Sequence, residues 1–458
     1  MSFDAINLQR RFDVFIKLYY LKKANQKASL GRAAYLLSIH CLNNFIEYDD
    51  NKKIIKCGSG DFEKSFEYTF KSIEKSGFQR EYSPIPIING KPINGAHRVA
   101  ISIYLNKRVA TEEVKTQDYT NFPYDFFVER QYPQELLERV FFNMIKHLPN
   151  TYCACLFPSS EDTHNEFLKI IENECTVVLD YKKGFNRIGK TVLMEILYSG
   201  EDWLGNRKNK FNGASDKYSR CFLNKNEVRI ICFQFNNNEP NIERVLKFKE
   251  LYRAIARKLK HSIHITDNDD ETSRLIESTL NENSMHWMNF QIIRALPKFT
   301  KKMLEFENFL IKNNVDKDAV IIVGGSVLAA YGLRDTDDID FITMKSSSAD
   351  IAMDIDYDCH NQYFADLGID TDCYFDESYF FNFMGFRFLK VEELKRFKLK
   401  RNEYKDRVDL KLIEQLKPNN YIILSKMRLY YLIFKCYLIN IKIKPTVKKI
   451  LYKLKMIS

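Results

Sequence analysis

Two aspartates on either side of Ile339 give the clearest indication of chemistry in this sequence. The alternation Asp338-Ile339-Asp340-Phe341 predicts a strand, and its period of two puts both carboxylates on one face. Adjacent carboxylates repel each other, and a divalent cation relieves that repulsion. Magnesium prefers oxygen ligands and commonly binds through one or two carboxylates plus the phosphates of a substrate. The pair is therefore predicted to hold Mg²⁺.

A glycine pair precedes these aspartates, at the end of a buried strand predicted from the apolar run AVIIV. Gly324 and Gly325 let the backbone approach a phosphate, and Ser326 is predicted to cap a short helix that ends at Gly332. The N–H groups at the start of that helix are donors for a phosphate. The glycines and the aspartates together predict a site for a magnesium-bound nucleotide.

The order of GGS, a short helix and DxD on a strand resembles the nucleotidyltransferase superfamily, which includes DNA polymerase beta and the minimal nucleotidyltransferases. The resemblance covers about residues 301–412 and implies a polymerase-beta-like fold there. It implies a nucleoside triphosphate or nucleotide-activated donor as the second cofactor beside Mg²⁺. It also implies roles for five residues: triphosphate binding by Gly324, Gly325 and Ser326, and catalysis through the metal by Asp338 and Asp340.

A later segment, KVEELKRFKLKRNEYKDRVDLKLI, also resembles the family through a K-D-x-x-D element at Lys405, Asp406 and Asp409, and this likeness implies that Lys405 binds nucleotide. The family usually takes a third carboxylate from a nearby strand, as the base for the attacking hydroxyl. The strands predicted in YFFNFMGFRFL carry no acid, and Asp372 and Asp376 come just before them. The third carboxylate is therefore left open.

A second motif that suits a phosphate lies near the N-terminus. The segment INGAHRVAISIYL places Asn94, Gly95, His97 and Arg98 in a turn that leads into a helix. Arginine and histidine at a helix start, after a glycine, make a natural phosphate clamp. Over about residues 62–125 the arrangement resembles the ParB/sulfiredoxin-like fold.

Three activities known in that fold are weighed against these residues. Ala96 stands where sulfiredoxin chemistry needs a cysteine, so this chemistry is excluded. A ParB-like role on nucleic acid lacks a basic recognition helix. The branch that phosphorylates small hydroxyl compounds uses an acid where Asn94 stands. Binding of a nucleotide or a phosphorylated ligand is the expectation, and a packed turn is the alternative.

The middle of the chain contains a P-loop spacing at Gly184, Gly189, Lys190 and Thr191, after a predicted strand and before a helix. The bulky loop interior, the lack of a later strand ending in a magnesium-binding aspartate, and the better nucleotide site elsewhere all count against this interpretation. In HSIHITDNDDET, capping of the following helix by Thr266 or Asp267 is favoured over a ligand cluster at His261 and His264.

The length of 458 residues predicts a multidomain protein, and strands mixed with helices predict an α/β (α+β) fold class. Four segments are expected, with soft boundaries: a ParB/sulfiredoxin-like domain over 1–125, an α/β middle domain over 126–300, the nucleotidyltransferase-like domain over 301–412, and a basic tail over 413–458. Hydrophobic residues at 45% and charged residues at 28% are typical of a globular protein.

The net charge of +10 comes from the tail. Ten of the 70 Lys and Arg lie in residues 417–458, which hold no Asp or Glu, so the rest of the chain carries 60 residues of each sign. Lysines alternate there with Leu, Ile, Tyr and Phe, but no apolar run is long enough to span a bilayer. Two interpretations of this tail stay open: peripheral contact with an anionic membrane surface, and packing of terminal helices. Nucleic-acid binding is less favoured than either.

The N-terminal residues show no cleavable signal, and the ten cysteines are scattered except for the pair Cys153 and Cys155. A cytoplasmic protein without a structural metal is expected, and association with the inner face of the membrane is left open.

These features predict a magnesium-dependent nucleotidyl or phospho-substituent transferase that acts on a hydroxyl acceptor. An acidic stretch also resembles the LicD-type transferases, which implies surface polysaccharide assembly and a lipid-linked glycan as acceptor. Three alternatives differ in kind: a toxin- or antitoxin-type nucleotidyltransferase that modifies RNA or protein, a small-molecule kinase centred on His97 and Arg98, and a non-catalytic scaffold.

Overall fold

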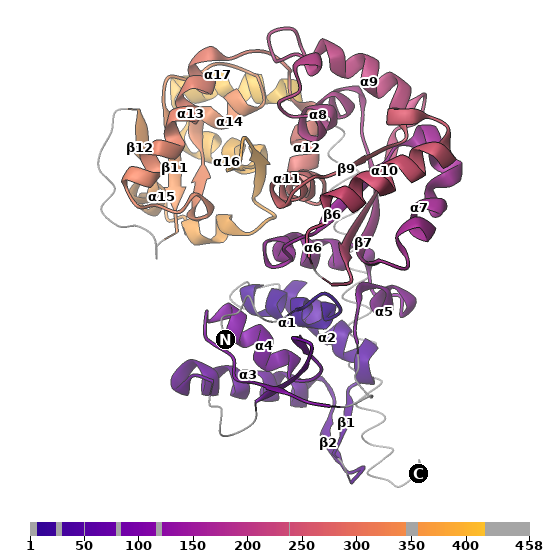
Figure 1. The fold of residues 1–458 in the computed structure, drawn as a ribbon. Coiled ribbons are helices and arrows are strands. Elements are labelled where there is room, and N and C mark those ends of the chain that lie inside the picture. The colour runs from indigo at the N-terminus through magenta and orange to yellow at the C-terminus, as the bar shows by residue number, and fades with distance from the viewer. Residues whose placement is uncertain are drawn as a thin grey trace.

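The computed structural model describes residues 7–23, 30–49, 51–78, 84–115, 121–237, 239–344 and 356–416. These residues form a mixed α/β structure in which four small sheets are covered by helices. In Figure 1 the N-terminal elements lie below, the middle elements surround one sheet at the upper right, and the C-terminal elements surround another at the upper left. The predicted α/β class is confirmed at this level.

The N-terminal elements are helical, with two small sheets, one of strands β1 and β2 and one in the order β4-β3-β5. A turn at Asn89 and Gly90, both with positive φ, joins β3 to β4 as the Asn-Gly pair predicts. The elements are α1 (Phe12–Lys23), α2 (Leu30–Asn43), β1 (Ile46–Tyr48), β2 (Ile54–Cys57), α3 (Ser59–Ser76), β3 (Ile85–Ile88), β4 (Lys91–Pro92), α4 (Ala96–Tyr104), β5 (Thr111–Glu113), α5 (Tyr124–Glu129) and α6 (Gln134–Met144).

The middle elements are built on a four-stranded antiparallel sheet in the order β7-β8-β6-β9. The inner strand β8 is almost wholly buried because its alternate side chains enter two hydrophobic clusters, one on each face of the sheet. The elements are β6 (Tyr152–Leu156), α7 (His164–Ile171), β7 (Cys175–Gly184), α8 (Arg187–Leu197), α9 (Asn212–Phe222), β8 (Glu227–Phe235), α10 (Ile242–Ala256), β9 (Ile263–Ile265), α11 (Asp269–Thr279) and α12 (Glu282–Phe290).

The C-terminal elements form a five-stranded sheet in the order β12-β11-β10-β14-β13. Helix α13 packs on this sheet through an apolar stripe that repeats every three to four residues, as an amphipathic helix requires. The elements are α13 (Pro297–Lys312), β10 (Val320–Ile322), α14 (Gly324–Ala330), β11 (Ile339–Thr343), β12 (Tyr357–Cys359), α15 (Asn361–Asp366), β13 (Phe380–Phe383), β14 (Phe386–Leu389), α16 (Val391–Arg401) and α17 (Tyr404–Ile413).

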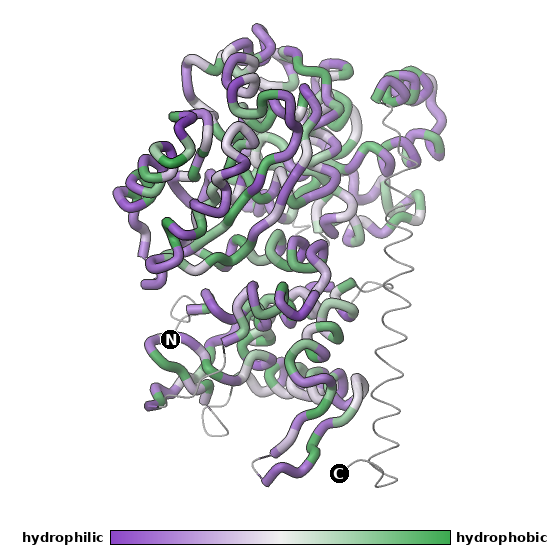
Figure 2. Tube along the Cα trace, turned by 90° about the vertical axis from the view of Figure 1, so that its right-hand side faces the viewer, coloured by the Kyte–Doolittle hydropathy of each residue, from purple (hydrophilic) through white to green (hydrophobic). Residues whose placement is uncertain are grey.

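One large hydrophobic cluster runs through all three groups of elements, from α1 to the end of the described chain. Most helices alternate hydrophobic and hydrophilic stretches, as Figure 2 shows, because each buries one face. A buried ionic contact adds to this cluster: the Lys23 ammonium at the end of α1 contacts the carboxylates of Asp376 and Glu377, just before β13. The N-terminal and C-terminal elements are therefore held together by apolar and ionic contacts.

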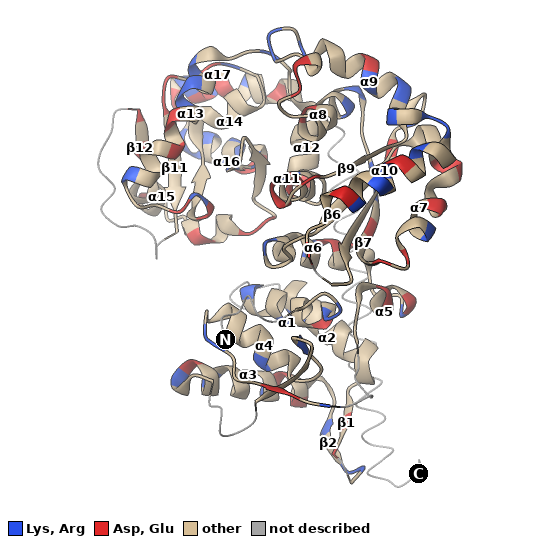
Figure 3. Ribbon diagram, viewed as in Figure 1, with Lys and Arg blue, Asp and Glu red and all other residues tan. Residues whose placement is uncertain are grey.

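Charged residues of both signs are interspersed over the helices in the view of Figure 3. The basic segment predicted to contact a membrane, residues 413–458, lies outside the described residues from 417 onward. Across the described ranges, which have gaps, no helix has both the length and the apolar character needed to cross a bilayer.

Candidate metal and nucleotide site

Two carboxylates from different strands meet at one edge of the five-stranded sheet. Strand β11 pairs in parallel with β12, and Asp340 lies directly opposite Asp358 in that register. Residues opposite each other on neighbouring strands project to the same face of a sheet. Ile339 and Phe341 are fully buried on the other face, as the alternation predicts.

His360 completes a group of three ligands at this edge. Its Nε2 lies 3.1 Å from Asp358 Oδ2 and 3.5 Å from Asp340 Oδ1. One ligand atom from each of Asp340, Asp358 and His360 lies within 4.8 Å of the other two. Among the described residues this is the one group of carboxylate, histidine or cysteine side chains with that geometry.

The electrostatics of the group favour a cation. Burial raises the pKa of Asp340, and the carboxylates of Asp338 and Asp358 also raise it, while His360 and Lys405 act in the opposite direction. The net direction is upward because burial is the largest cause, and the two neighbouring carboxylates add to it. A bound divalent cation would reverse that balance, so the donor set fits one.

Close packing against Asp340 requires a glycine at position 324. A Cβ atom at Gly324 would lie 1.9 Å from Asp340 Oδ2, and Gly324 has φ of +63°, which disfavours other residues. The backbone N–H of Val323 also donates to the Asp340 carbonyl. The glycine pair therefore places the main chain directly beside the carboxylate group.

Ser326 does not cap the helix, so that prediction is wrong. Helix α14 begins at Gly324 with Val323 as its N-cap residue, which puts Ser326 inside the helix, where it is fully buried. Its hydroxyl donates to the backbone carbonyl of Asp338 at 3.0 Å. The side chain thus fixes the turn that precedes β11. Triphosphate binding by Ser326 stays a prediction, and it would use the backbone N–H rather than the hydroxyl.

Asp338 lies just before β11 and is exposed, whereas Asp340 lies within the strand. The Thr336 hydroxyl donates to Asp338 Oδ1 at 2.8 Å. This contact orients the Asp338 carboxylate, which is close enough to raise the pKa of Asp340. Asp338 therefore acts on Asp340 electrostatically, but it is not one of the three residues of the ligand group, so its role as a metal ligand stays a prediction.

A buried ionic network supports the site from α16 and α17. Arg334, on the loop before β11, donates to both carboxylate oxygens of Asp409 at 2.8 and 3.1 Å. Lys398 lies 2.7 Å from Asp409 and 3.1 Å from Asp406. In the K-D-x-x-D element the two aspartates are therefore engaged inside the protein, while Lys405 is exposed and affects the pKa of Asp340.

Sequence reasoning missed two of the three residues of this ligand group, Asp358 and His360. Asp358 is in a three-residue strand after a polar segment, and three residues are too few to reveal a periodic pattern. The alternation Tyr357-Asp358-Cys359 is the one available signal. Neither of the two aspartates that the sequence offered as the third carboxylate belongs to the ligand group. Asp376 is bound to Lys23, and Asp372 lies in the short 3₁₀ helix that ends just before Asp376.

The residues of the second predicted phosphate site are placed at the start of α4. Gly95 is the N-cap residue in a left-handed conformation, and Asn94 is exposed. The His97 Nε2 lies 3.0 Å from the Tyr35 hydroxyl, and its ring packs against Phe66.

Burial lowers the pKa of His97 well below its usual range, so this ring is neutral. Arg98 lies over the Phe78 ring, 5.8 Å from its centroid. The four residues are adjacent along the chain, but His97 is directed into the N-terminal core. Phosphate binding here stays a prediction.

The P-loop spacing in the middle segment does not form a free phosphate cradle. The Lys190 ammonium donates to the Lys225 carbonyl at 2.7 Å and to Asn226 Oδ1 at 2.8 Å. Strand β7 pairs with an antiparallel neighbour, and Asn186 caps α8 by accepting from Gly189 N. Asn268, rather than Thr266 or Asp267, caps α11.

Comparisons with models of protein families, with curated proteins and with solved structures each returned no match for this chain. What the candidate site does is therefore argued from its own geometry.

Proposed function

We propose that this protein is a magnesium-dependent nucleotidyltransferase of the polymerase-beta-like class that transfers a nucleotidyl or phospho-substituted group to a hydroxyl acceptor. One observation carries the proposal: Asp340 and Asp358 lie opposite each other on parallel strands, beside a glycine pair at the start of a helix. The resemblance of GGS and DxD to that class calls for a third carboxylate from a nearby strand, and Asp358 supplies it.

The carboxylates divide into two roles in this proposal. Asp338 and Asp340 would hold the cation, which would supply positive charge to the phosphates and the leaving oxygen. Asp358 accepts the proton of the acceptor hydroxyl. The acceptor oxygen then forms a bond to phosphorus while the bond from phosphorus to the leaving phosphate breaks.

The donor phosphates are held by the main chain at Gly324 and Gly325 and by the Lys405 ammonium. Added Cβ atoms at the two glycines would lie 1.9 Å from Asp340 Oδ2 and 2.8 Å from Arg334 Nη2, so these charged side chains lie against the glycine main chain. Lys405 is exposed on α17 near Asp340. A flexible lysine suits a phosphate as a mobile point charge. The ion pair of Arg334 with Asp409 links the loop before β11 to α17, and the Arg334 guanidinium lies beside Gly325.

The proposed acceptor is a hydroxyl compound such as a lipid-linked glycan at the inner membrane face. This part rests on the LicD-like resemblance and on the basic tail. Its direct test is transfer of a labelled phosphate-containing group from a nucleotide-activated donor to an acceptor in anionic vesicles.

The experiment that tests the site is titration calorimetry with ATP and CTP, with and without Mg²⁺. Wild-type protein should bind one of these nucleotides in a magnesium-dependent way, and Asp338→Ala/Asp340→Ala should not. Asp366→Asn, an exposed aspartate of α15 outside the ligand group, is the matched control and should bind as wild type does. Unchanged binding by the double variant, with its folding verified by circular dichroism, would refute the proposal.

A further inference from the structure

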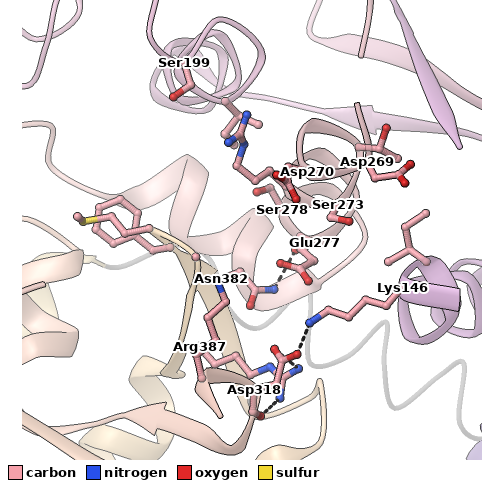
Figure 4. A pocket seen from close by; sticks show the side chains of 18 of the residues that line it. Lys146, Ser199, Asp269, Asp270, Ser273, Glu277, Ser278, Asp318, Asn382 and Arg387 are labelled. Atoms are coloured by element: carbon pink, nitrogen blue, oxygen red, sulfur yellow. Dashed lines mark hydrogen bonds and ion pairs between the residues drawn. The ribbon is translucent and has the colours of Figure 1, made fainter. Parts of the chain in front are cut away.

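A cavity of about 780 Å³ lies between the middle and C-terminal elements. Its walls come from α8 and α11 on one side and from the β13–β14 hairpin on the other (Figure 4). The hairpin turn and Asp318, which precedes β10, mark one end of the five-stranded sheet, whereas Asp340 lies at the other end of β10. The cavity is therefore separate from the candidate metal site.

One wall presents unpaired hydrogen-bond acceptors. Asp270, Ser273 and Glu277 follow each other at spacings of three and four on α11 and so share one side of that helix. The Glu277 carboxylate is half-buried and forms no hydrogen bond or ion pair with another described residue. Burial raises its pKa, as expected for a carboxyl group without a cationic partner.

Two of the nearby cations are paired: Lys146 and Arg387 both contact the carboxylate of Asp318, as the dashed lines in Figure 4 show. Arg274 on α11 and Lys317 also line the cavity, so its lining carries charges of both signs. A ligand that brings hydroxyl donors would satisfy the acceptors on α11.

The opposite wall contributes apolar side chains beside the polar Asn382 and Arg387. Trp287 and Phe383 pack with their ring centroids 4.6 Å apart, and Met384 is 38% exposed at the hairpin tip. Met384 and Gly385 have φ of +51° and +77°, as the two central residues of a tight hairpin turn between β13 and β14 require. Apolar side chains on one wall and hydrogen-bond acceptors on the other suit a ligand that has an apolar C–H face and several hydroxyl groups.

We propose that this cavity is a binding site for a small polyhydroxylated ligand of one to a few sugar rings. Its volume is within the usual range of ligand pockets, about 300 to 1,000 Å³. Glu277, Asp270 and Ser273 accept hydrogen bonds from ligand hydroxyls. The Asn382 amide donates to the Glu277 backbone carbonyl and so connects the β13–β14 hairpin to α11. Phe383 and Met384 cover the C–H face of the ring. This proposal does not depend on nucleotide transfer at Asp340.

The test is saturation-transfer NMR on the full chain. The probes are glucose, galactose, N-acetylglucosamine, glucosamine, maltose and, as an acyclic polyol, sorbitol, each at about 10 mM to detect the millimolar affinities common for simple sugars. At least one ring sugar should show saturation transfer. Ser273→Leu, which fills the cavity, should abolish the signal, and Glu277→Gln should weaken binding about tenfold.

Two control variants test whether sugar binding depends on this cavity rather than on carboxylates elsewhere. Glu305→Gln on α13 removes a carboxylate that does not line the cavity, and Asp340→Ala removes the candidate metal ligand; both should bind the sugar as wild type does. Thermal unfolding checks that each variant is folded. Absence of transfer from every probe, or transfer that survives Ser273→Leu, would overturn the assignment.

Discussion

Asp340 and Asp358 stand directly opposite each other on the parallel strands β11 and β12, with the His360 ring within 3.5 Å of both carboxylates. The two aspartates differ in environment: the Asp340 side chain is 18% exposed and that of Asp358 is 63% exposed. The inner carboxylate is suited to holding a cation at a fixed position, and the outer one can meet an incoming acceptor.

The first prediction concerns this pair. Asp358→Asn should lower the transfer rate by at least about a hundredfold while nucleotide affinity falls much less, because the base acts only in the transition state. Single-turnover kinetics with a labelled donor measures the first quantity and calorimetry the second. Asp366→Asn is the control. Equal losses in rate and in affinity would assign Asp358 to metal binding instead.

The second prediction uses two glycines that share a backbone conformation. Gly324→Ala should disrupt Asp340, because a Cβ there would lie 1.9 Å from the carboxylate oxygen, and should abolish binding of the metal–nucleotide complex. Gly368→Ala has a similar φ of +69° but open space around its Cβ. It should cost only the backbone strain, about 1 kcal/mol in the free energy of unfolding, and leave binding intact. Calorimetry and thermal unfolding measure both effects.

The third prediction concerns the lysine of α17. Lys405→Ala should weaken nucleotide binding about tenfold, which corresponds to about 1.4 kcal/mol, and should leave the melting temperature unchanged because this side chain is exposed. Lys411→Ala on the same helix serves as the control for a general loss of positive charge. If both variants weaken binding equally, Lys405 has no specific role.

The sequence predicted the strands and turns around the site better than the contacts within it. The strand predicted from the run AVIIV is present as β10, and the strand predicted from Asp338 to Phe341 is present as β11, because apolar runs and period-two alternation act locally. Asp358 could not be predicted as a partner of Asp340, because the pairing of β11 with β12 is set by tertiary packing. The role of Ser326 was missed for a related reason: its acceptor, the Asp338 carbonyl, is placed by the fold.

The fourth prediction tests the ionic network behind the site. Asp409→Asn leaves Lys398 and Arg334 without one of their charged acceptors, and loss of one partner from a buried ion pair costs about 3 kcal/mol. Chemical denaturation should show that loss in the free energy of unfolding. Asp366→Asn should change it by less than about 0.5 kcal/mol, as exposed substitutions usually do. A value near zero for Asp409→Asn would mean that water replaces the carboxylate.

The fifth prediction concerns pH and the buried histidine of β9. Burial lowers the pKa of His264 to about 3, and its ring packs against Tyr198 with an unpartnered Nε2. The unfolded chain takes up a proton on this histidine below about pH 6.5, whereas the folded protein does not until about pH 3. Stability therefore falls as pH is lowered through that window, by about 2 kcal/mol at pH 5.

Replacement of His264 removes this proton uptake. The free energy of unfolding of His264→Phe should fall less between pH 7 and pH 5 than that of wild type, by about 2 kcal/mol, as measured by denaturant titration at each pH. His264→Gln removes the titrating group but keeps a polar side chain, so it should show the same weaker pH dependence at a different absolute stability. A slope equal to that of wild type in both variants would show that His264 remains neutral in the unfolded chain or is protonated in the folded one.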